Sequence, residues 1–381
     1  MRVALITETF LPHVNGVVTT LCRQLEHLQA HGHEAILFAP QGAPESYAGA
    51  QIVPLHGLPL PMYPELQLTP PQFGVTPRLR QFQPDILHLA GLAALGPTAR
   101  YVAQSLSIPL VGAYHTDFPA YSTHYGLGFL KGLVYHYLRW IHNGCSMTLC
   151  PSSATFSDLR AHGFHRLRLW GRGVDTTRFH PKNRSEAWRA STRLQQGEIM
   201  LLYVGRLATE KRVELLIDAV RGLEGVRLVL VGDGPLRSEL EDRFAGLPVH
   251  FAGYLSGDEL ATAYASADMF VFPSDTETFG QVIQEAMASG LPVVAAEAGG
   301  SLDLVQNNIT GLFFRPGDAQ NLRVQVQQLV DNPYRLTQMG CAGRTAAEQR
   351  SWERVMHKLF RYYTQVCHNK TLLRRYIRPI R

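Results

Sequence analysis

Two cations stand close together after one apolar, strand-like run in the second half of the chain. Arg206 directly follows the run 200–205, and Lys211 comes five residues later. A guanidinium can bind two phosphate oxygens at once, whereas an ammonium acts as a point charge, and the combination suits a diphosphate. The alternative is structural, because both cations could form surface salt bridges with Glu210 or Glu214.

Two glutamates and two backbone amides follow a second strand-like run, 269–273. Glu277 precedes a helical pattern, and Glu285 lies inside that pattern eight residues later. Carboxylates accept hydrogen bonds from sugar hydroxyls, and the amides of Phe279 and Gly280 could face an anion at the start of the helix. In the structural alternative, Glu277 is only a capping charge and Glu285 is a solvated helix residue.

Several common motifs are absent from the sequence. Three Gly-x-Gly openings, at Gly126, Gly171 and Gly232, lack the third glycine of a dinucleotide fingerprint, which disfavours a nicotinamide-dependent dehydrogenase. A Walker A loop, H-E-x-x-H and G-x-S-x-G are also missing. Because there is no Asp-x-Asp pair, metal-bridged binding of a diphosphate is not available, and we expect no metal among the site residues. We also expect no cofactor. A bound diphosphate would then have to be neutralised by side-chain cations and backbone amides.

Short apolar runs alternate with helical patterns along the chain. The first half predicts a helix at 17–30 and strands at 2–6, 35–39, 51–55, 86–89, 110–113 and 147–151. The second half predicts helices at 213–221, 236–244, 258–265 and 280–288, and strands at 200–205, 227–232, 250–253, 269–273, 292–295 and 311–313. This alternation is typical of doubly wound parallel sheets, so the expected fold class is α/β.

The composition divides the chain into parts. Residues 180–197 are polar and basic, and we interpret them as a linker. We expect a Rossmann-like N-terminal domain over 1–180, a Rossmann-like C-terminal domain over 198–350, a helix over 351–367 that crosses back to the N-terminal domain, and a basic tail over 368–381. Because ligands bind beyond the carboxyl ends of strands in such sheets, the two domains should face each other across a cleft.

The combination of motifs resembles one large enzyme family. Glu277-x7-Glu285, Gly205-Arg206 with Lys211, the Asn15-Gly16 turn and the run Val-Gly-Asp-Gly-Pro at 231–235 are similar to those of retaining glycosyltransferase family 4, which has the GT-B fold. The resemblance covers nearly the whole chain. It implies metal-independent hexosyl transfer with retention, from a nucleotide-sugar donor held mainly by the C-terminal domain to an acceptor held by the N-terminal domain.

On the phosphate side, the resemblance implies that Arg206 and Lys211 hold the donor diphosphate and act in catalysis. Gly16 would let backbone amides at the head of helix 17–30 approach the donor phosphate. The amides of Phe279 and Gly280 would lie nearby, next to the transferred sugar. These five residues form the expected donor contacts around the leaving group.

On the sugar side, Glu277 would bind the hydroxyls of the transferred sugar, and Glu285 would bind the ribose. His115, after the run 110–113, matches the cleft histidine of lipid-directed family members. It would hydrogen-bond the sugar and steady charge in an oxocarbenium-like transition state, although a histidine at a strand end can also be a core residue. Asp117 and Tyr63 are further candidates on the acceptor or sugar side.

The two halves of the chain resemble enzymes with different substrates. Segments 59–68, expected to be a loop, and 121–128 look like those of enzymes that glycosylate diacylglycerol, notably sulfoquinovosyl transferases. Segments 277–285 and 171–175 look like those of GDP-mannose-dependent α-mannosyltransferases that act on glycolipids. Because the C-terminal domain holds the donor, we expect GDP-mannose as donor and a membrane glycolipid or diacylglycerol-type acceptor. UDP-sulfoquinovose with diacylglycerol is the alternative.

Charge and composition bear on location and partners. The net charge is +5, and residues 368–381 hold five basic residues without an acidic one, so the rest of the chain sums to zero. This tail could bind an anionic membrane surface or simply be solvated. Segment 129–142 combines basic and aromatic residues in a helical pattern, which suits an interfacial membrane contact or a core helix.

The five scattered cysteines and the lack of an apolar leader predict a cytoplasmic protein, here peripheral on the inner face of the membrane. A nucleic-acid partner is not expected. A non-catalytic sugar-nucleotide binder or a nucleic-acid binder remains the alternative from another class.

Overall fold

The computed structural model describes residues 1–13, 15–60, 63–68, 74–91, 94–119 and 128–376. Its first sheet has the strand order β10-β9-β8-β7-β1-β2-β4-β3, in which all neighbours are parallel except β3 and β4. The strands are β1 (Arg2–Ile6), β2 (Glu34–Pro40), β3 (Ser46–Tyr47), β4 (Ala50–Leu55), β7 (Ile86–Leu89), β8 (Leu110–Ala113), β9 (Met147–Cys150) and β10 (Leu167–Leu169).

The second sheet is parallel throughout, with the order β13-β12-β11-β14-β15-β16. Its strands are β11 (Ile199–Val204), β12 (Val226–Val231), β13 (Val249–Gly253), β14 (Met269–Phe272), β15 (Val293–Ala296) and β16 (Gly311–Phe314). Both sheets reverse direction of winding at a central strand, β1 in the first and β11 in the second, as doubly wound folds do. The prediction of two doubly wound α/β units is confirmed.

Helices cover both faces of each sheet, as the apolar strands require. The side chains of Met200, Leu201, Leu202 and Tyr203 in β11 are all fully buried, so successive residues need cover on opposite faces. The helices of the first unit are α1 (Gly16–Ala30), α2 (Val75–Phe82), α3 (Leu95–Ser105), α5 (Lys131–His142) and α6 (Ser153–Ala161). Those of the second are α7 (Glu186–Ser191), α8 (Leu215–Val220), α9 (Arg237–Arg243), α10 (Gly257–Ser266), α11 (Gln281–Ala288), α12 (Ser301–Leu304), α13 (Ala319–Val330) and α14 (Pro333–Glu348).

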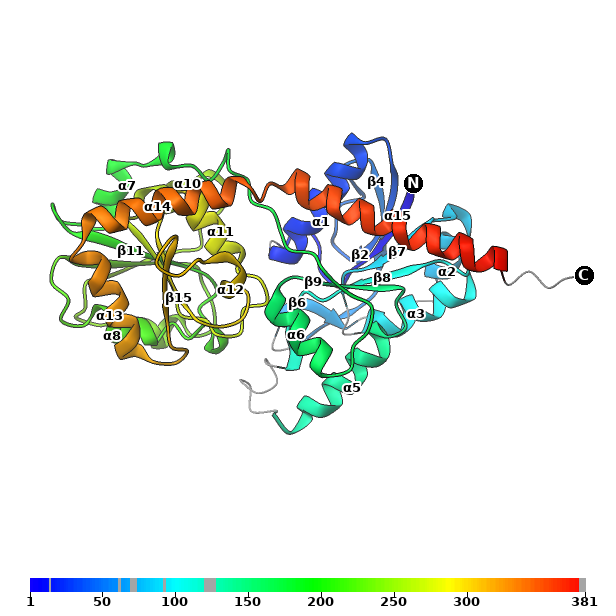
Figure 1. The fold of residues 1–381 in the computed structure, drawn as a ribbon, viewed down its shortest axis with the longest axis horizontal. Coiled ribbons are helices and arrows are strands. Elements are labelled where there is room, and N and C mark those ends of the chain that lie inside the picture. The colour runs from blue at the N-terminus through cyan, green and yellow to red at the C-terminus, as the bar shows by residue number, and fades with distance from the viewer. Residues whose placement is uncertain (14, 61–62, 69–73, 92–93, 120–127, 377–381) are drawn as a thin grey trace, which may run out of the picture.

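The last helix, α15 (Trp352–Tyr376), leaves the second unit and runs across the first (Figure 1). Met356, Leu359 and Tyr363 of α15 are buried in the same cluster as the apolar face of α1. The indole Nε1–H of Trp170 donates to the carbonyl of Val355, 3.2 Å away. Helix α15 therefore completes the core of the first unit and ties the two units together.

Three segments differ from the sequence predictions. Segment 59–68 is not a simple loop, because β5 (Leu58–Leu60) and β6 (Tyr63–Leu68) form an antiparallel pair. Residues 180–197 are not a free linker: they contain α7, and Trp188 packs against the core of the second unit. Residues 368–376 continue α15 rather than forming a separate tail. Among the described residues, no helix combines the length and apolarity that crossing a membrane requires.

Candidate active site

A cavity of about 280 Å³ is lined by residues from both units. The first unit contributes residues that follow β1, β7, β8 and β10, and the second contributes residues that follow β11 and β14. These are the carboxyl ends of parallel strands, where doubly wound sheets bind ligands. The cavity brings together five residues predicted from the sequence, namely Gly16, His115, Arg206, Lys211 and Glu277.

Lys211 and Glu277 form an ion pair at this cavity. The Nζ atom of Lys211 lies 2.7 Å from Oε2 of Glu277, and the two side chains are only 16% and 21% exposed. Lys211 ends a short 3-10 turn after β11, whereas Glu277 follows β14, the strand that neighbours β11. Glu214, considered above as a partner for the cations, pairs with Arg212.

The Glu277 carboxylate is held in its ionised form. Burial alone would raise its pKa, but Lys211, Arg172 and a hydrogen bond from the amide of Phe279 lower the pKa below its ordinary value. We expected this amide to face a donor anion, and that expectation needs correction, because the Phe279 N–H donates to Glu277. Neither Phe279 nor Gly280 lines the cavity, and Gly280, at φ +93°, turns the chain into α11.

His115 lines the cavity from the end of β8 as a neutral imidazole. Burial lowers its pKa well below the ordinary value, and the charges of Arg172, His88 and His142 act in the same direction. Its backbone carbonyl accepts a hydrogen bond of 3.0 Å from the hydroxyl of Thr278, in the loop after β14. The histidine is therefore anchored where the two units meet.

Arg172 is a cavity residue that sequence reasoning missed. It is 8% exposed, and its Nε is buried without a hydrogen-bond partner among the described residues. A Cβ on Gly16 would come within 2.1 Å of its Nη1, so a glycine is required there for the guanidinium to fit. The sequence signal that could have identified Arg172 was the Gly171-Arg172-Gly173 motif. Glycines on both sides of a charged residue let other parts of the chain pack closely around it.

The first amides of α1 are capped by the side chain of the N-cap residue, Asn15. Asn15 Oδ1 accepts hydrogen bonds of 2.9 and 3.0 Å from the amides of Val17 and Val18. We expected Gly16 to let these amides approach a donor phosphate, but the amides of Val17 and Val18 already donate to Asn15. Gly16 instead makes room for the Arg172 guanidinium.

Glu8 is a second cavity residue that sequence reasoning missed. It follows β1, is 3% exposed, and its Oε1 accepts hydrogen bonds of 2.5 and 2.8 Å from the amides of Ala94 and Leu95 at the start of α3. The sequence signal that could have identified Glu8 was an acidic residue shortly after a buried strand. Carboxylates thus line the cavity from both units.

Glycines hold the Arg206 loop in place. Gly232 has φ +135°, and a Cβ there would lie 1.9 Å from the carbonyl oxygen of Gly205. A Cβ on Gly234 would likewise come within 2.4 Å of the carbonyl oxygen of Leu207. The loop after β12, with Gly232 and Gly234, can lie against the loop after β11 only with glycine at these positions. This packing directs Arg206 to the cavity.

Other predicted residues lie outside the cavity lining. Glu285 is partly buried in α11, where burial raises its pKa to about 7 and the hydroxyl of Tyr264 donates to its Oε2 at 3.1 Å. It is therefore not the solvated helix residue of the structural alternative. Asp117 follows β8 but does not line the cavity. Tyr63 belongs to β6, and its side chain lies outside the described residues.

Among the described lining residues, three cations (Arg172, Arg206 and Lys211) face two carboxylates (Glu8 and Glu277). The surplus of positive charge suits an anion such as a diphosphate, and carboxylates beside it can accept hydrogen bonds from sugar hydroxyls. A neutral imidazole adds one hydrogen-bond donor and one acceptor. The arrangement can therefore bind a sugar attached to a diphosphate and stabilise the departing phosphate.

Comparisons with known proteins agree with this chemistry. Residues 14–178 match the model of Glycosyltransferase Family 4, and residues 184–346 match that of Glycosyl transferases group 1. A GDP-mannose-dependent alpha-mannosyltransferase of Corynebacterium glutamicum is 39% identical over 372 residues, which cover 96% of this chain and 89% of that protein. Sulfoquinovosyl transferase SQD2 of Arabidopsis thaliana is 36% identical over 94% of this chain and 72% of that protein.

Solved structures share the fold at lower sequence identity. Sucrose-phosphate synthase from Thermosynechococcus elongatus superposes with a TM-score of 0.81 at 23% identity, over 96% of this chain and 98% of that one. Anabaena HepE in complex with UDP gives a TM-score of 0.79 at 19% identity, over 96% of this chain and 100% of that one. The chain is a retaining, nucleotide-sugar-dependent hexosyltransferase that belongs to glycosyltransferase family 4 and has the GT-B fold.

Proposed function

We propose that this enzyme transfers mannose from GDP-mannose to a membrane glycolipid or a diacylglycerol-type acceptor, with retention at the anomeric carbon. The observation that carries the proposal is the buried Lys211–Glu277 pair beside Arg206 and His115 in one cavity. The identity of the sugar rests on the likeness to GDP-mannose-dependent α-mannosyltransferases over nearly the full chain.

Four cavity residues have a role in this proposal. Arg206 and Lys211 bind the diphosphate and stabilise the charge that grows on it as the sugar leaves. Glu277 holds hydroxyls of the transferred sugar, and His115 donates a hydrogen bond to it. Outside the cavity lining, Glu285 binds the ribose, while the turn at Phe279 and Gly280 positions Glu277.

The reaction needs no protein group that removes the acceptor proton. The bond between the anomeric carbon and the phosphate oxygen breaks, and a bond from that carbon to the acceptor hydroxyl oxygen forms on the same face. The hydroxyl proton passes to an oxygen of the departing diphosphate, which carries the bonding electron pair. The chain supplies orientation and electrostatic stabilisation rather than proton transfer.

A membrane acceptor is supported by the surface of α5 and the turn before it. Phe129, Leu133 and Trp140 are 80%, 65% and 46% exposed, and Lys131 lies on the same short segment. Exposed apolar and aromatic side chains flanked by basic ones are typical of helices that lie in a membrane interface. The enzyme would then act as a peripheral protein on the inner, cytoplasmic face, with Asp117 and Tyr63 on the acceptor side.

One observation favours the second candidate, UDP-sulfoquinovose:diacylglycerol sulfoquinovosyltransferase. Arg172 is a third cavity cation, and its buried Nε has no hydrogen-bond partner among the described residues. A sulfonate on the transferred sugar would match that guanidinium. The likeness to SQD2 over most of the chain supports the same candidate.

A donor screen tests both candidates. The full-length enzyme is incubated with GDP-mannose, UDP-sulfoquinovose or UDP-glucose and detergent-dispersed diacylglycerol or glycolipid, and the lipid products are identified by mass and by NMR of the anomeric proton. We expect an α-linked mannolipid, absent with the Glu277→Gln variant, and turnover that survives EDTA because Arg206 and Lys211 neutralise the diphosphate. Faster turnover with UDP-sulfoquinovose would replace the first candidate by the second.

A further inference from the structure

Three histidines from two helices lie together at the end of α1 that is far from the cavity. His27 lies in the last turn of α1, His31 is the C-cap residue that follows this helix, and His357 belongs to the second turn of α15. One ligand nitrogen from each lies within 4.8 Å of the others. Within the described part of the chain, this is the one group of three or more histidine, cysteine or acidic side chains close enough to share a metal ion. We propose that His27, His31 and His357 form a Zn²⁺ site that fastens α15 to α1.

The spacing of the residues suits a shared ion. Positions four apart on a helix lie on the same face, one turn above the other, and two histidines so spaced are a known zinc-binding arrangement. The ring centroids are 4.0 Å apart for His27 and His31, 5.1 Å for His27 and His357, and 5.5 Å for His31 and His357. Zinc–nitrogen bonds of about 2.0–2.1 Å place two tetrahedral ligands roughly 3.4 Å apart. Rotation of the exposed His357 ring can close the remaining gap.

The protonation state of His27 and the hydrogen bond of His31 both suit a metal ligand. Burial, followed by the neighbouring His31 and His357, lowers the pKa of His27 to about 4, so its ring is neutral and keeps a lone pair. The Nδ1 of His31 lies 2.9 Å from the carbonyl oxygen of His27 and donates to it, which leaves Nε2 free to bind a metal. Second-shell hydrogen bonds of this kind orient histidine ligands in metal sites.

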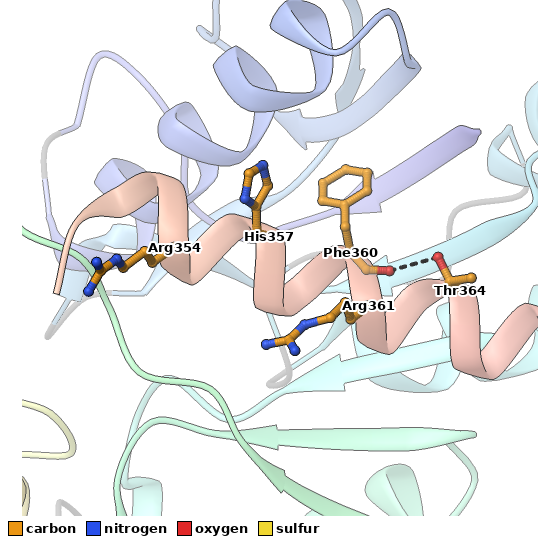
Figure 2. Close-up of a pocket in the computed structure, with 5 residues that line it drawn as sticks. All are labelled: Arg354, His357, Phe360, Arg361 and Thr364. Carbon is orange, nitrogen blue, oxygen red and sulfur yellow. Dashed lines mark hydrogen bonds between the residues drawn. The ribbon is translucent and has the colours of Figure 1, made fainter. Parts of the chain in front are cut away.

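The surrounding charges permit a cation. Figure 2 shows His357 and Phe360 projecting from α15 toward one side, whereas Arg354 and Arg361 project away from them. Glu353, one turn before His357, acts on His27 in the direction that favours positive charge. The nearby His33 is engaged elsewhere, since its Nδ1 lies 3.1 Å from the N-terminal amine and its ring stacks on Phe360.

The three ligand atoms determine which class of metal ion the site would bind. Three imidazole nitrogens favour zinc and its neighbours nickel and copper over magnesium or calcium, which prefer oxygen ligands. Because the site is at the surface, water would supply the fourth ligand of a tetrahedral zinc. The ion would join α15, which carries Met356, Leu359 and Tyr363 into the core, to α1.

The test uses the tag-free, full-length chain after removal of metals with EDTA. ZnCl₂ is titrated in by calorimetry, and thermal unfolding is followed with and without the ion. We expect one equivalent of Zn²⁺ to bind and to raise the unfolding temperature, because an ion that binds only the folded state stabilises it by mass action. In His357→Gln the affinity should fall by ~10-fold or more, while the unfolding temperature without metal stays the same.

His165→Gln, which changes an exposed histidine elsewhere, is the matched control and should bind zinc like the wild type. Co²⁺ should give the visible bands of a tetrahedral complex in the wild type and lose them in His357→Gln. Equal zinc binding by the wild type and His357→Gln, no rise in unfolding temperature, or an equal effect of Mg²⁺ would each overturn the proposal. None of these readouts depends on glycosyl transfer.

Discussion

The Nζ atom of Lys211 lies 2.7 Å from Oε2 of Glu277, although the two residues are 66 positions apart. They come from the loops after β11 and β14, which are adjacent strands of the second sheet. In the proposed function Lys211 binds the diphosphate and Glu277 binds the sugar, so the ion pair holds each side chain beside the group that it contacts. A donor that binds here must share Lys211 with the carboxylate.

Replacement of either phosphate-binding cation should slow turnover. Arg206→Ala and Lys211→Ala each remove a positive charge that, in the proposed function, faces the leaving diphosphate, and we expect a loss of ~10²-fold or more in kcat/KM. In Lys211→Ala the pKa of Glu277 should also rise, because Lys211 is the chief group that lowers it. Steady-state kinetics with thermal unfolding as a control for folding check this. Wild-type rates in both variants would place the diphosphate elsewhere.

Glu277→Gln should affect catalysis more than nucleotide binding. The amide keeps the shape of the side chain but loses the charge that pairs with Lys211 and accepts sugar hydroxyls, so kcat should fall while the affinity for GDP, measured by calorimetry, changes by less than about tenfold. His115→Ala should behave in the same way, because in the proposed function the imidazole contacts the sugar rather than the nucleotide. Parallel losses of affinity and rate would argue against these roles.

Gly16→Ala should act through Arg172. The added Cβ would lie 2.1 Å from Nη1 of Arg172, so the guanidinium must leave its position in the cavity. We expect Gly16→Ala and Arg172→Ala to lower kcat/KM by similar factors and the double variant to be no worse than either, since they remove the same interaction. Gly74→Ala, where the structure offers open space, is the control. Losses of kcat/KM that add up in the double variant would show that the two residues act independently.

Nucleotide binding should release a proton from Glu285. Its pKa is raised to about 7, and hydrogen bonds from the ribose hydroxyls would favour the ionised form, which accepts them more strongly. The affinity for GDP should therefore be constant above pH 7 and fall as the pH drops below it. Calorimetry in buffers of different ionisation enthalpy measures the proton released, and Glu285→Gln should abolish it. Proton release that persists in this variant would exclude Glu285 as the source.

Membrane binding should have an apolar part and an ionic part. Burial of the exposed Phe129 and Leu133 side chains contributes ~1.5–3 kcal/mol each, so Phe129→Ser with Leu133→Ser should reduce binding to anionic liposomes even at high salt. Arg374→Gln with Arg375→Gln should reduce only the binding seen at low salt. Tyr101→Ser, at another exposed site, is the control. Co-sedimentation that is unchanged in both double variants would contradict a membrane contact at either place.

Local pattern was sufficient for most strands of the two parallel sheets and for the loops that follow them, but it missed the β5–β6 pair and α7. The apolar runs that become β8, β11 and β14 can be read from the sequence because strands buried on both faces need continuous apolar residues. Their carboxyl ends then locate His115, Arg206, Lys211 and Glu277, because ligand sites of doubly wound sheets lie there. These four residues do line one cavity.

Contacts between elements were decided by the tertiary structure alone. The Lys211–Glu277 pair depends on β14 lying beside β11, and the Arg172 position depends on the backbone of Gly16, 156 residues away. The cluster of His27, His31 and His357 exists because α15 crosses back onto α1. Periodicity reports which side of an element is buried, but the partner of that side is set by the order of strands and the path of the crossovers, which no local pattern encodes.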